Sequence, residues 1–471
     1  MVLGRVMAQR RSVEVAFAYA AALSPGTRAN CRAISEAAGH EGWHRMQGLL
    51  GSYVWDWKDL RAELPALAEA WLPGDEDDLI GPGLAIDETA DIKAGDFTAC
   101  TAPQHAGVTN SVENCVTSVF SAYVTSGGQA WADFDVYMPD RWAKDMPRRR
   151  AAGIPDDLEF ATKPELAAVQ LGRLLKAGLP LRWVAADEVY GRSSKLRKAC
   201  RKAGLASVFI IPCNFSVATG AGTVFEAQDA IADAVFEQRS CGNGSKGPRY
   251  SDRALIATKD PREFLLIRRL ISRPDSCTFY LCYVPQDRPA TLPYLVMIAG
   301  RRWPVEETFK TGKDVLGWDQ SQVRGFDGIC RHTALSALAQ LRGIAIRNAL
   351  TGQITLPPAA ARDDQEPAGP RPGTSTAGTA ADPIDDADLR IPVGDAPVPA
   401  RGGLPCPRAI TAIKLSVAET MRLADIAEQY AAGLIDQARL AFALRWSARR
   451  RRHQARARWH HYSSRLLPGI T

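Results

Sequence analysis

The chain has 471 residues, of which 46% are hydrophobic and 23% are charged, so it holds enough apolar material for a large folded core. Ten cysteines are too few for a disulfide scaffold, and none has the spacing of a zinc site, so we expect reduced thiols in a cytoplasmic protein. The net charge of +6 is segregated, because residues 352–400 carry eight acids and three bases whereas Arg445–Arg465 has eight arginines and no acid.

The first 75 residues have the pattern of a helical domain. Apolar residues recur at near-helical spacing in four segments, Val13–Leu23, Arg28–Ala38, Gly42–Leu50 and Trp55–Trp71. The first segment imitates a secretion signal, but Glu14 interrupts its apolar run, so we expect an amphipathic helix there. No segment approaches the ~18 consecutive apolar residues of a membrane span, and none is predicted.

Strand-like segments dominate the region that follows. Residues rich in β-branched and aromatic side chains, or short apolar runs, predict strands at Leu84–Thr89 and Val116–Val124 and, with a weaker pattern, at Phe97–Ala102. Ala130–Met138 either extends this sheet or forms an elaboration of it. A capping box at Thr162–Glu165 then opens a helix that we expect to end near Gly178. The pattern continues with a strand, a helix and a strand, at Arg182–Asp187, Ser193–Ala203 and Ala206–Pro212. The order β-β-β-α-β-α-β predicts an α/β protein with a mixed sheet and flanking helices.

A β-rich insertion interrupts this alternation. Its strand candidates are Glu263–Ile267, Cys277–Val284 and Pro293–Ile298, and a helical pattern resumes at Trp303 and again at Arg331–Leu350. Proline, glycine and aspartate then dominate without periodicity, which predicts a flexible acidic linker before a basic helical tail. The expected regions are 1–75 (helical), 76–212 (first part of the sheet-based core), 213–300 (β-rich insertion), 301–351 (second part of the core), 352–407 (acidic linker) and 408–471 (basic tail).

Three acidic residues stand where this topology would bring them together. Asp87 lies on the first strand, Asp187 ends the adjacent fourth strand, and Glu306 lies in the first turn of the helix after the insertion. Carboxylate oxygens select Mg²⁺ or Mn²⁺, and two such ions can serve phosphodiester chemistry. The alternative is that the three are ordinary acids at strand ends and helix starts, where acids are common.

The residues around these acids resemble the motifs of DDE transposases from bacterial insertion sequences. Ile86–Thr89 resembles their D-x-T motif, Asp187–Gly191 resembles D-x-x-Y-G, and Arg302–Lys313 is similar to the R-x(3)-E-x(6)-K signature of the cut-and-paste branch. Further segments fit the same family, namely Asn114–Cys115, Pro155–Glu165, Lys246–Tyr250 and Gln322–Arg324. The resemblance covers residues 28–350, and its strength lies in the order of the motifs on the expected elements.

The resemblance implies an RNase H-like fold split by a β-rich insertion, and cleavage and transfer of DNA strands at the ends of an insertion sequence. It implies Mg²⁺, or Mn²⁺, on Asp87, Asp187 and Glu306, and DNA contacts by Arg302, Lys313, Tyr190, Lys246, Arg249 and Arg324. The implied partners are the double-stranded inverted-repeat ends and a target DNA, bound by a dimer in the bacterial cytoplasm at the nucleoid. The N-terminal helices are expected to read the ends, and the arginines of 445–465 to contact DNA.

Several alternatives stay open at this point. Glu307 is a rival for Glu306, although the signature spacing favours Glu306. Trp303 is expected to pack into the core, with stacking on a base as the alternative. Ala299 replaces a tyrosine common in the family, and Pro103–His105 replaces its Arg-Gln-Tyr. A catalytically silent DNA-binding repressor and a metal-dependent nuclease without a transfer step are therefore the competing functions.

Overall fold

The computed structural model describes residues 2–24, 27–218, 223–244 and 247–350, together with short stretches between residues 416 and 455. One compact unit comprises residues 1–354 with 415–425, and the fold below is that of this unit. The acidic linker expected over 352–407 lies outside the described residues, as does most of the arginine-rich segment 445–465. In the part of the chain that the structure describes, no helix has both the length and the apolar character to cross a membrane.

The N-terminal region is helical, as its periodicity predicted. Side-chain caps begin two of its helices, because Asn30 accepts a hydrogen bond from the backbone N–H of Ala33 and Asp56 accepts one from that of Lys58. The helix after Asp56 packs against the long C-terminal helix of the unit. The helices are α1 (Val2–Val6), α2 (Arg10–Ala22), α3 (Cys31–Ala37), α4 (His44–Leu50) and α5 (Trp57–Trp71).

The central sheet is mixed and has the strand arrangement expected for an RNase H-like core. Strand β1 pairs antiparallel with β3 on one side and parallel with β5 on the other, and β5 pairs parallel with β6. The long strand β3 also pairs antiparallel with β2 through its first residues and with β4 through the rest of its length. These strands are β1 (Gly83–Ile92), β2 (Ala102–Ala106), β3 (Ser111–Thr125), β4 (Gly128–Val136), β5 (Trp183–Ala186) and β6 (Ala206–Ile211).

The strand predicted at Phe97–Ala102 is wrong, since β2 begins only at Ala102. Residues 93–101 form a bent connection in which Cys100 has a φ of 63°, a left-handed conformation that a strand does not accept. The backbone N–H of Ala99 donates to the carbonyl of Arg324 instead of to a neighbouring strand. The weak apolar pattern of this segment therefore reflects a loop that is held by a distant part of the chain.

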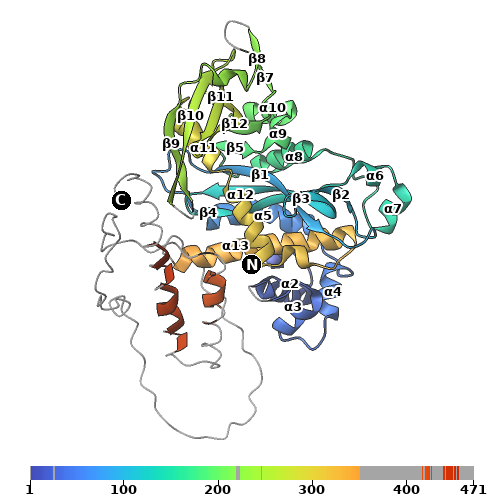
Figure 1. Cartoon of the computed structure of the whole chain (residues 1–471). Helices are drawn as coiled ribbons and strands as arrows, with labels where there is room; N and C mark the ends of the chain where they lie inside the picture. Colours follow the sequence, from blue (N-terminus) through green and yellow to red (C-terminus); the bar gives the residue numbers. More distant parts are fainter. Residues whose placement is uncertain are drawn as a thin grey trace, which may run out of the picture. The chain divides into compact units, whose positions relative to one another are not determined.

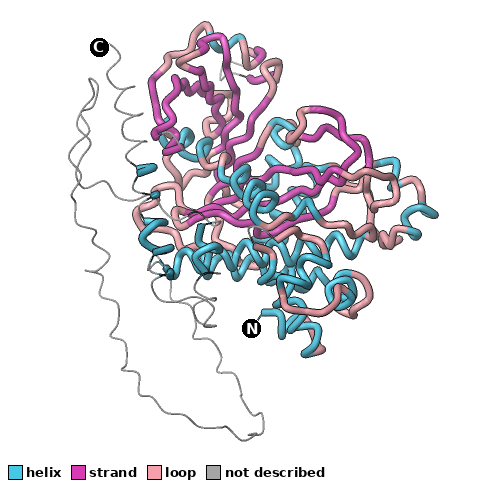
Figure 2. The backbone as a smooth tube through the Cα atoms, turned by 60° about the horizontal axis from the view of Figure 1, so that its bottom comes forward, coloured by secondary structure: helices cyan, strands magenta, loops and turns pink. Residues whose placement is uncertain are grey.

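Helices cover both faces of the sheet (Figure 1). The helix expected after the capping box is α8 (Lys163–Lys176), and Thr162 and Glu165 form that box. Figure 2 shows the same layers from a second side, with the strands between two groups of helices. The helices of the core are α6 (Asp140–Ala143), α7 (Met146–Ala151), α8, α9 (Glu188–Gly191), α10 (Ser194–Lys202), α12 (Pro304–Lys310) and α13 (Phe326–Leu350).

The insertion adds four strands, β9 to β12, to the central sheet, while β7 and β8 pair with each other in a separate two-stranded sheet. Its last strand, β12, pairs antiparallel with β6, with Phe279 opposite Ile211. The sheet consequently has ten strands in one hydrogen-bonded surface, while the insertion adds a small hydrophobic core of its own around Val217, Leu265 and Phe279. The strands are β7 (Ser216–Ala218), β8 (Val224–Glu226), β9 (Glu237–Gly244), β10 (Gly247–Ala257), β11 (Glu263–Leu270) and β12 (Arg273–Tyr283).

The last predicted strand of the insertion, Pro293–Ile298, is a helix, α11 (Leu292–Gly300). Its side chains are apolar nearly all round, and Leu295, Val296 and Ile298 are buried. A short, wholly apolar run is the pattern that a buried strand and a buried helix share, so periodicity does not separate them. The helix packs closely on β9, because a Cβ at Gly300 would lie 2.1 Å from the carbonyl oxygen of Cys241.

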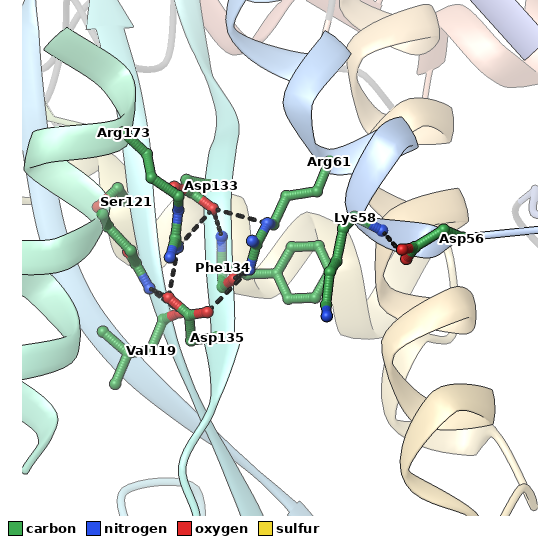
Figure 3. Close-up of polar contacts among 10 residues, drawn as sticks. Asp56, Lys58, Arg61, Val119, Ser121, Asp133, Phe134, Asp135 and Arg173 are labelled. Carbon is green, nitrogen blue, oxygen red and sulfur yellow. Dashed lines mark hydrogen bonds and ion pairs between the residues drawn. The ribbon is translucent and has the colours of Figure 1, made fainter. Parts of the chain in front are cut away.

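A buried ion network joins α5, β4 and α8 (Figure 3). Asp133 and Asp135 are two residues apart on β4, so their side chains lie on the same face of the strand. Arg61 of α5 and Arg173 of α8 form ion pairs with them there. Arg173 Nε lies 2.9 Å from Asp133 Oδ2, and Arg61 Nη1 lies 2.8 Å from Asp135 Oδ1. The side chain of Asp133 is only 4% exposed, so its charge depends on these arginines for compensation.

Candidate catalytic site

Two of the three predicted acids lie side by side at the centre of the sheet. Strands β1 and β5 are parallel neighbours with Ile86 opposite Ala186, so Asp87 and Asp187 follow paired residues. At this point β1 continues, whereas β5 ends and Asp187 becomes the N-cap of α9. The Asp187 carboxylate accepts a hydrogen bond from the backbone N–H of Val189 at 3.0 Å, which fixes its orientation.

The third acid reaches the same place from α12. Arg302 Nη1 donates to Asp87 Oδ2 at 2.8 Å, and its Nη2 lies 3.7 Å from Glu306 Oε1. Glu307 turns elsewhere and accepts a hydrogen bond from Gln129 at 2.7 Å. The structure therefore brings Asp87, Asp187 and Glu306 together and separates Glu307 from them, as the motif spacing favoured.

Burial and mutual repulsion disfavour the charged form of the two aspartates. Burial raises the pKa of Asp87 well above its usual range, Arg302 opposes that rise, and the charges of Asp187, Glu88 and Glu306 add to it. The pKa of Asp187 rises to about 6, mainly through burial and then through repulsion by Glu88, against the pull of Arg302 and of backbone N–H groups. A bound cation would relieve both the desolvation and the repulsion.

The carboxylate oxygens of Asp87, Asp187 and Glu306 are ligands that Mg²⁺ and Mn²⁺ prefer. A divalent cation would also neutralise the negative charge that these three groups bring together. Among the described residues, no three His, Cys, Asp or Glu side chains already stand close enough to form a metal cage. The guanidinium of Arg302 instead lies between Asp87 and Glu306 and supplies the positive charge there. The residues fit the ion in chemistry and charge, with Arg302 as the present counterion.

The two cations of the predicted signature are held against the core. Arg302 pairs with Asp87, as described, and its side chain is 20% exposed. Lys313 lies in a π-helical turn, Thr311–Val315, and its Nζ donates to the carbonyl of Ala90 at 2.7 Å. Burial lowers the pKa of Lys313. Both residues thus line the strand that carries Asp87, and their contact with DNA remains a prediction.

The expected DNA contact of Tyr190 is wrong for this structure. The side chain, which belongs to α9, is fully buried, and its hydroxyl donates to Glu88 Oε2 at 2.5 Å. Glu88 also pairs with Lys163 at 2.9 Å. Sequence reasoning missed Lys163 as a neighbour of the site, whereas Glu88, directly after Asp87, was expected on the opposite face of the strand.

The remaining predicted DNA contacts fall into different environments. Arg249 donates from Nη2 to the carbonyls of Cys241 at 3.3 Å and Gly300 at 3.1 Å, so it ties β10 to β9 and α11. Lys246 lies outside the described residues. Arg324 is exposed on the loop that precedes α13. Trp303 is 53% exposed, so the expected packing of this ring into the core is wrong.

A cavity of about 690 Å³ lies beside Arg324, between the N-terminal helices and the loop 321–328. Hydrogen bonds between distant segments hold its walls, because the Ala29 N–H donates to Gln320 and the Phe326 N–H donates to the carbonyl of Ala152. The loop is also tied to β1, since Lys93 Nζ donates to the carbonyl of Ser321 at 2.7 Å. Aromatic, amide and basic side chains line the cavity, among them Asn30, Arg32, Trp43, Gln47 and Gln322.

Comparison with known proteins identifies the family of this chain. A family model described as a DDE superfamily endonuclease matches residues 3–251, which is more than half of the chain. The chain belongs to the DDE superfamily. A second model, described as a transposase DDE domain, matches residues 165–341, so the two matches together span Asp87, Asp187 and Glu306.

A curated relative agrees with this membership. The probable transposase for insertion sequence element IS701 of Microchaete diplosiphon is 26% identical over 328 residues, which make up 67% of this chain and 79% of the relative. This DDE protein is accordingly a transposase of an insertion sequence, with a DDE endonuclease core on an RNase H-like fold. DNA is therefore its substrate.

Proposed function

We propose that this transposase cleaves the ends of its insertion sequence and joins the freed 3′-hydroxyl to target DNA, with Mg²⁺ held by Asp87, Asp187 and Glu306. Mn²⁺ has the same preference for oxygen donors and could replace it. The observation that carries the proposal is the convergence of the three acids, from β1, the end of β5 and α12, around Arg302. The family membership supports the reaction class.

When bound, the metal would supply a polarised water and stabilise the leaving oxygen of the phosphodiester. In the first step a water oxygen bonds to phosphorus, the phosphorus–O3′ bond breaks, and a proton leaves the water and one reaches O3′. In the second step that 3′-hydroxyl loses its proton and its oxygen bonds to a phosphorus of the target strand. The bond from this phosphorus to the O3′ of the target breaks, and the released O3′ takes up a proton. Asp87 is held by a strand and Asp187 by its role as a helix cap, so the two carboxylates have fixed positions. They would therefore hold the metal, the attacking oxygen and the phosphodiester in a constant arrangement. Arg302 would bind a phosphate oxygen of the reacting strand.

A strand-transfer assay tests this function against its alternatives. Purified protein is mixed with Mg²⁺, a labelled duplex of the element end and a supercoiled plasmid, and products are separated on a gel. Joined products are expected. Cleavage without joining would identify a nuclease, and a stable complex without cleavage would identify a silent DNA-binding protein. Two end duplexes of different length in one reaction would reveal whether a dimer pairs two ends, as we propose.

The metal requirement should depend on pH through Asp187. Its pKa is about 6 in the folded protein, against an ordinary value of 3.8. Ligands must be ionised to bind metal, so the Mg²⁺ concentration for half-maximal cleavage should rise about tenfold per pH unit below 6 and level off above 7. The measurement is a Mg²⁺ titration of cleavage between pH 5 and pH 8. A requirement that is flat across this range would contradict the proposed role of Asp187.

The same shift has a consequence for the stability of the metal-free protein. A raised pKa means that the protonated carboxyl is favoured by folding, so the contribution is complete below pH 4 and is lost as the pH rises from 4 to 6. In the presence of a chelator, the free energy of unfolding of the parent should therefore fall between pH 4 and pH 6. The part of this fall that is due to Asp187 should be absent in the Asp187→Asn variant. Saturating Mg²⁺ should restore stability above pH 6 in the parent alone.

We also propose that end DNA crosses the loop 321–328 and the cavity beside it. Arg324 offers an exposed guanidinium on this loop, and Trp43 and Gln322 offer stacking and hydrogen-bonding groups in the cavity. Arg324→Ala should weaken end binding and reduce the slope of log affinity against log salt by about 1, the loss of one phosphate contact. Binding is measured by fluorescence anisotropy at several salt concentrations. Lys176→Ala, an exposed lysine at the end of α8, is the control and should keep the parental slope.

A further inference from the structure

Tyr190 lies between the two segments of the chain that carry the aspartates of the candidate site. It belongs to α9, the single helical turn that Asp187 caps by accepting a hydrogen bond from the backbone N–H of Val189 at 3.0 Å. Its hydroxyl donates to Glu88, the residue directly after Asp87 on β1. One buried side chain thereby spans the distance between the ligand-bearing end of β5 and the ligand-bearing part of β1.

Glu88 has two partners on the face of β1 opposite Asp87. Neighbouring residues of a strand point to opposite faces, so Glu88 cannot share the direction of Asp87. Its Oε2 accepts the hydroxyl of Tyr190 at 2.5 Å, and its Oε1 lies 2.9 Å from Nζ of Lys163 at the start of α8. The side chain of Glu88 is 18% exposed. Both carboxylate oxygens are therefore committed to helices behind the strand.

The helix that carries Tyr190 has little freedom to shift. α9 is a single turn that packs against β6, and a Cβ at Gly191 would lie 1.9 Å from the carbonyl oxygen of Ile210. The backbone of α9 therefore touches the backbone of β6 directly at Gly191. A hydroxyl anchored on such a support holds Glu88, and with it the adjacent part of β1, at a defined distance from Asp187.

We propose that Glu88 and Tyr190 are positioning residues, which set the separation of the Asp87 and Asp187 carboxylates without binding the metal themselves. Lys163 compensates the charge of Glu88 in this arrangement. The proposal rests on the proposed metal-binding role of the two aspartates. Hydrogen-bonded partners behind metal-binding carboxylates commonly change metal affinity by about 10- to 100-fold when they are removed.

Direct metal binding tests this inference. Mn²⁺ binding to the full chain is followed by electron paramagnetic resonance, and cleavage is titrated with Mg²⁺ in parallel. Tyr190→Phe removes only the hydroxyl and should raise the Mn²⁺ dissociation constant and the Mg²⁺ requirement about 10-fold. Glu88→Ala should have a similar effect, and the double variant should be no worse than the more affected single variant. Saturating metal should restore cleavage in all three.

A matched control separates positioning from general loss of stability. Ser121→Ala removes another buried hydroxyl, which donates to Gln170 at 2.7 Å on β3. It should lower the unfolding midpoint about as much as Tyr190→Phe but leave metal affinity unchanged. Parental metal affinity in Tyr190→Phe, or additive effects in the double variant, would overturn the inference. Failure of saturating metal to restore cleavage in the Glu88→Ala variant would also overturn it, because Glu88 would then act as a metal ligand. A parent protein that binds no Mn²⁺ would instead overturn the proposed function.

Discussion

An Asp187→Asn protein is expected to bind end DNA like the parent and to cleave it at least about 1,000-fold more slowly. Loss of one proposed metal ligand removes several kcal/mol of transition-state stabilisation, and each 1.36 kcal/mol is a factor of ten in rate. Asparagine keeps the oxygen that caps α9, so the local fold should survive the change. Single-turnover cleavage and anisotropy with the same labelled duplex provide the two measurements.

The neighbouring acids supply the control for this prediction. Glu306→Gln should lose cleavage to a similar degree, whereas Glu307→Gln should stay within about twofold of the parent, because Glu307 bonds to Gln129 and not to the site. Cleavage at the parental rate by Asp187→Asn would remove the basis for the assignment of this acid. Equal losses in both glutamate variants would show instead that α12 tolerates no change.

Arg173→Met is expected to lower the free energy of unfolding by about 3–5 kcal/mol, the cost of leaving a buried charge without its partner. Asp133 is nearly inaccessible, and Arg173 bonds to it at 2.9 and 3.1 Å and reaches Asp135 at 2.5 Å (Figure 3). Burial is the main cause that raises the pKa of Asp133, so the carboxylate tolerates the interior only with its arginines present. Urea denaturation followed by tryptophan fluorescence gives the measurement.

Two further variants test the cause of this loss. Asp133→Asn in the Arg173→Met background should recover part of the stability, because the uncompensated charge is then gone. Arg150→Met removes an exposed arginine from its pair with Asp156 and should change stability little. A loss in Arg150→Met as large as that in Arg173→Met would attribute the effect to helix packing, and not to the buried charge.

Local and neighbouring features were predictable from the sequence. The capping box of α8 was visible because Thr162 and Glu165 act within one turn of chain. The meeting of Asp87 and Asp187 followed from parallel pairing of adjacent strands, which the alternation of elements indicated. Glu306 was preferred over Glu307 by motif spacing, and the separate contact of Glu307 with Gln129 agrees with that choice.

The features that sequence reasoning missed depend on partners far along the chain. Tyr190 meets Glu88 across 102 positions, and Arg302 meets Asp87 across 215 positions. A motif match alone does not predict whether its tyrosine or arginine is exposed to solvent or bonded to a buried carboxylate. The helix α11 was mistaken for a strand for a related reason, since its apolar run is too short and too uniform to display a period.

The order of the proposed ligands along the chain also bears on the synthesis of this enzyme. Asp87 and Asp187 are made first, and the whole insertion, with its four strands of the central sheet, intervenes before α12 supplies Glu306. A chain that ends within the insertion would own two of the three acids and lack both Glu306 and Arg302. Such a fragment could carry the helical N-terminal region without the means to cut. Placement of the last acid so late ties the ability to break DNA to completion of the fold.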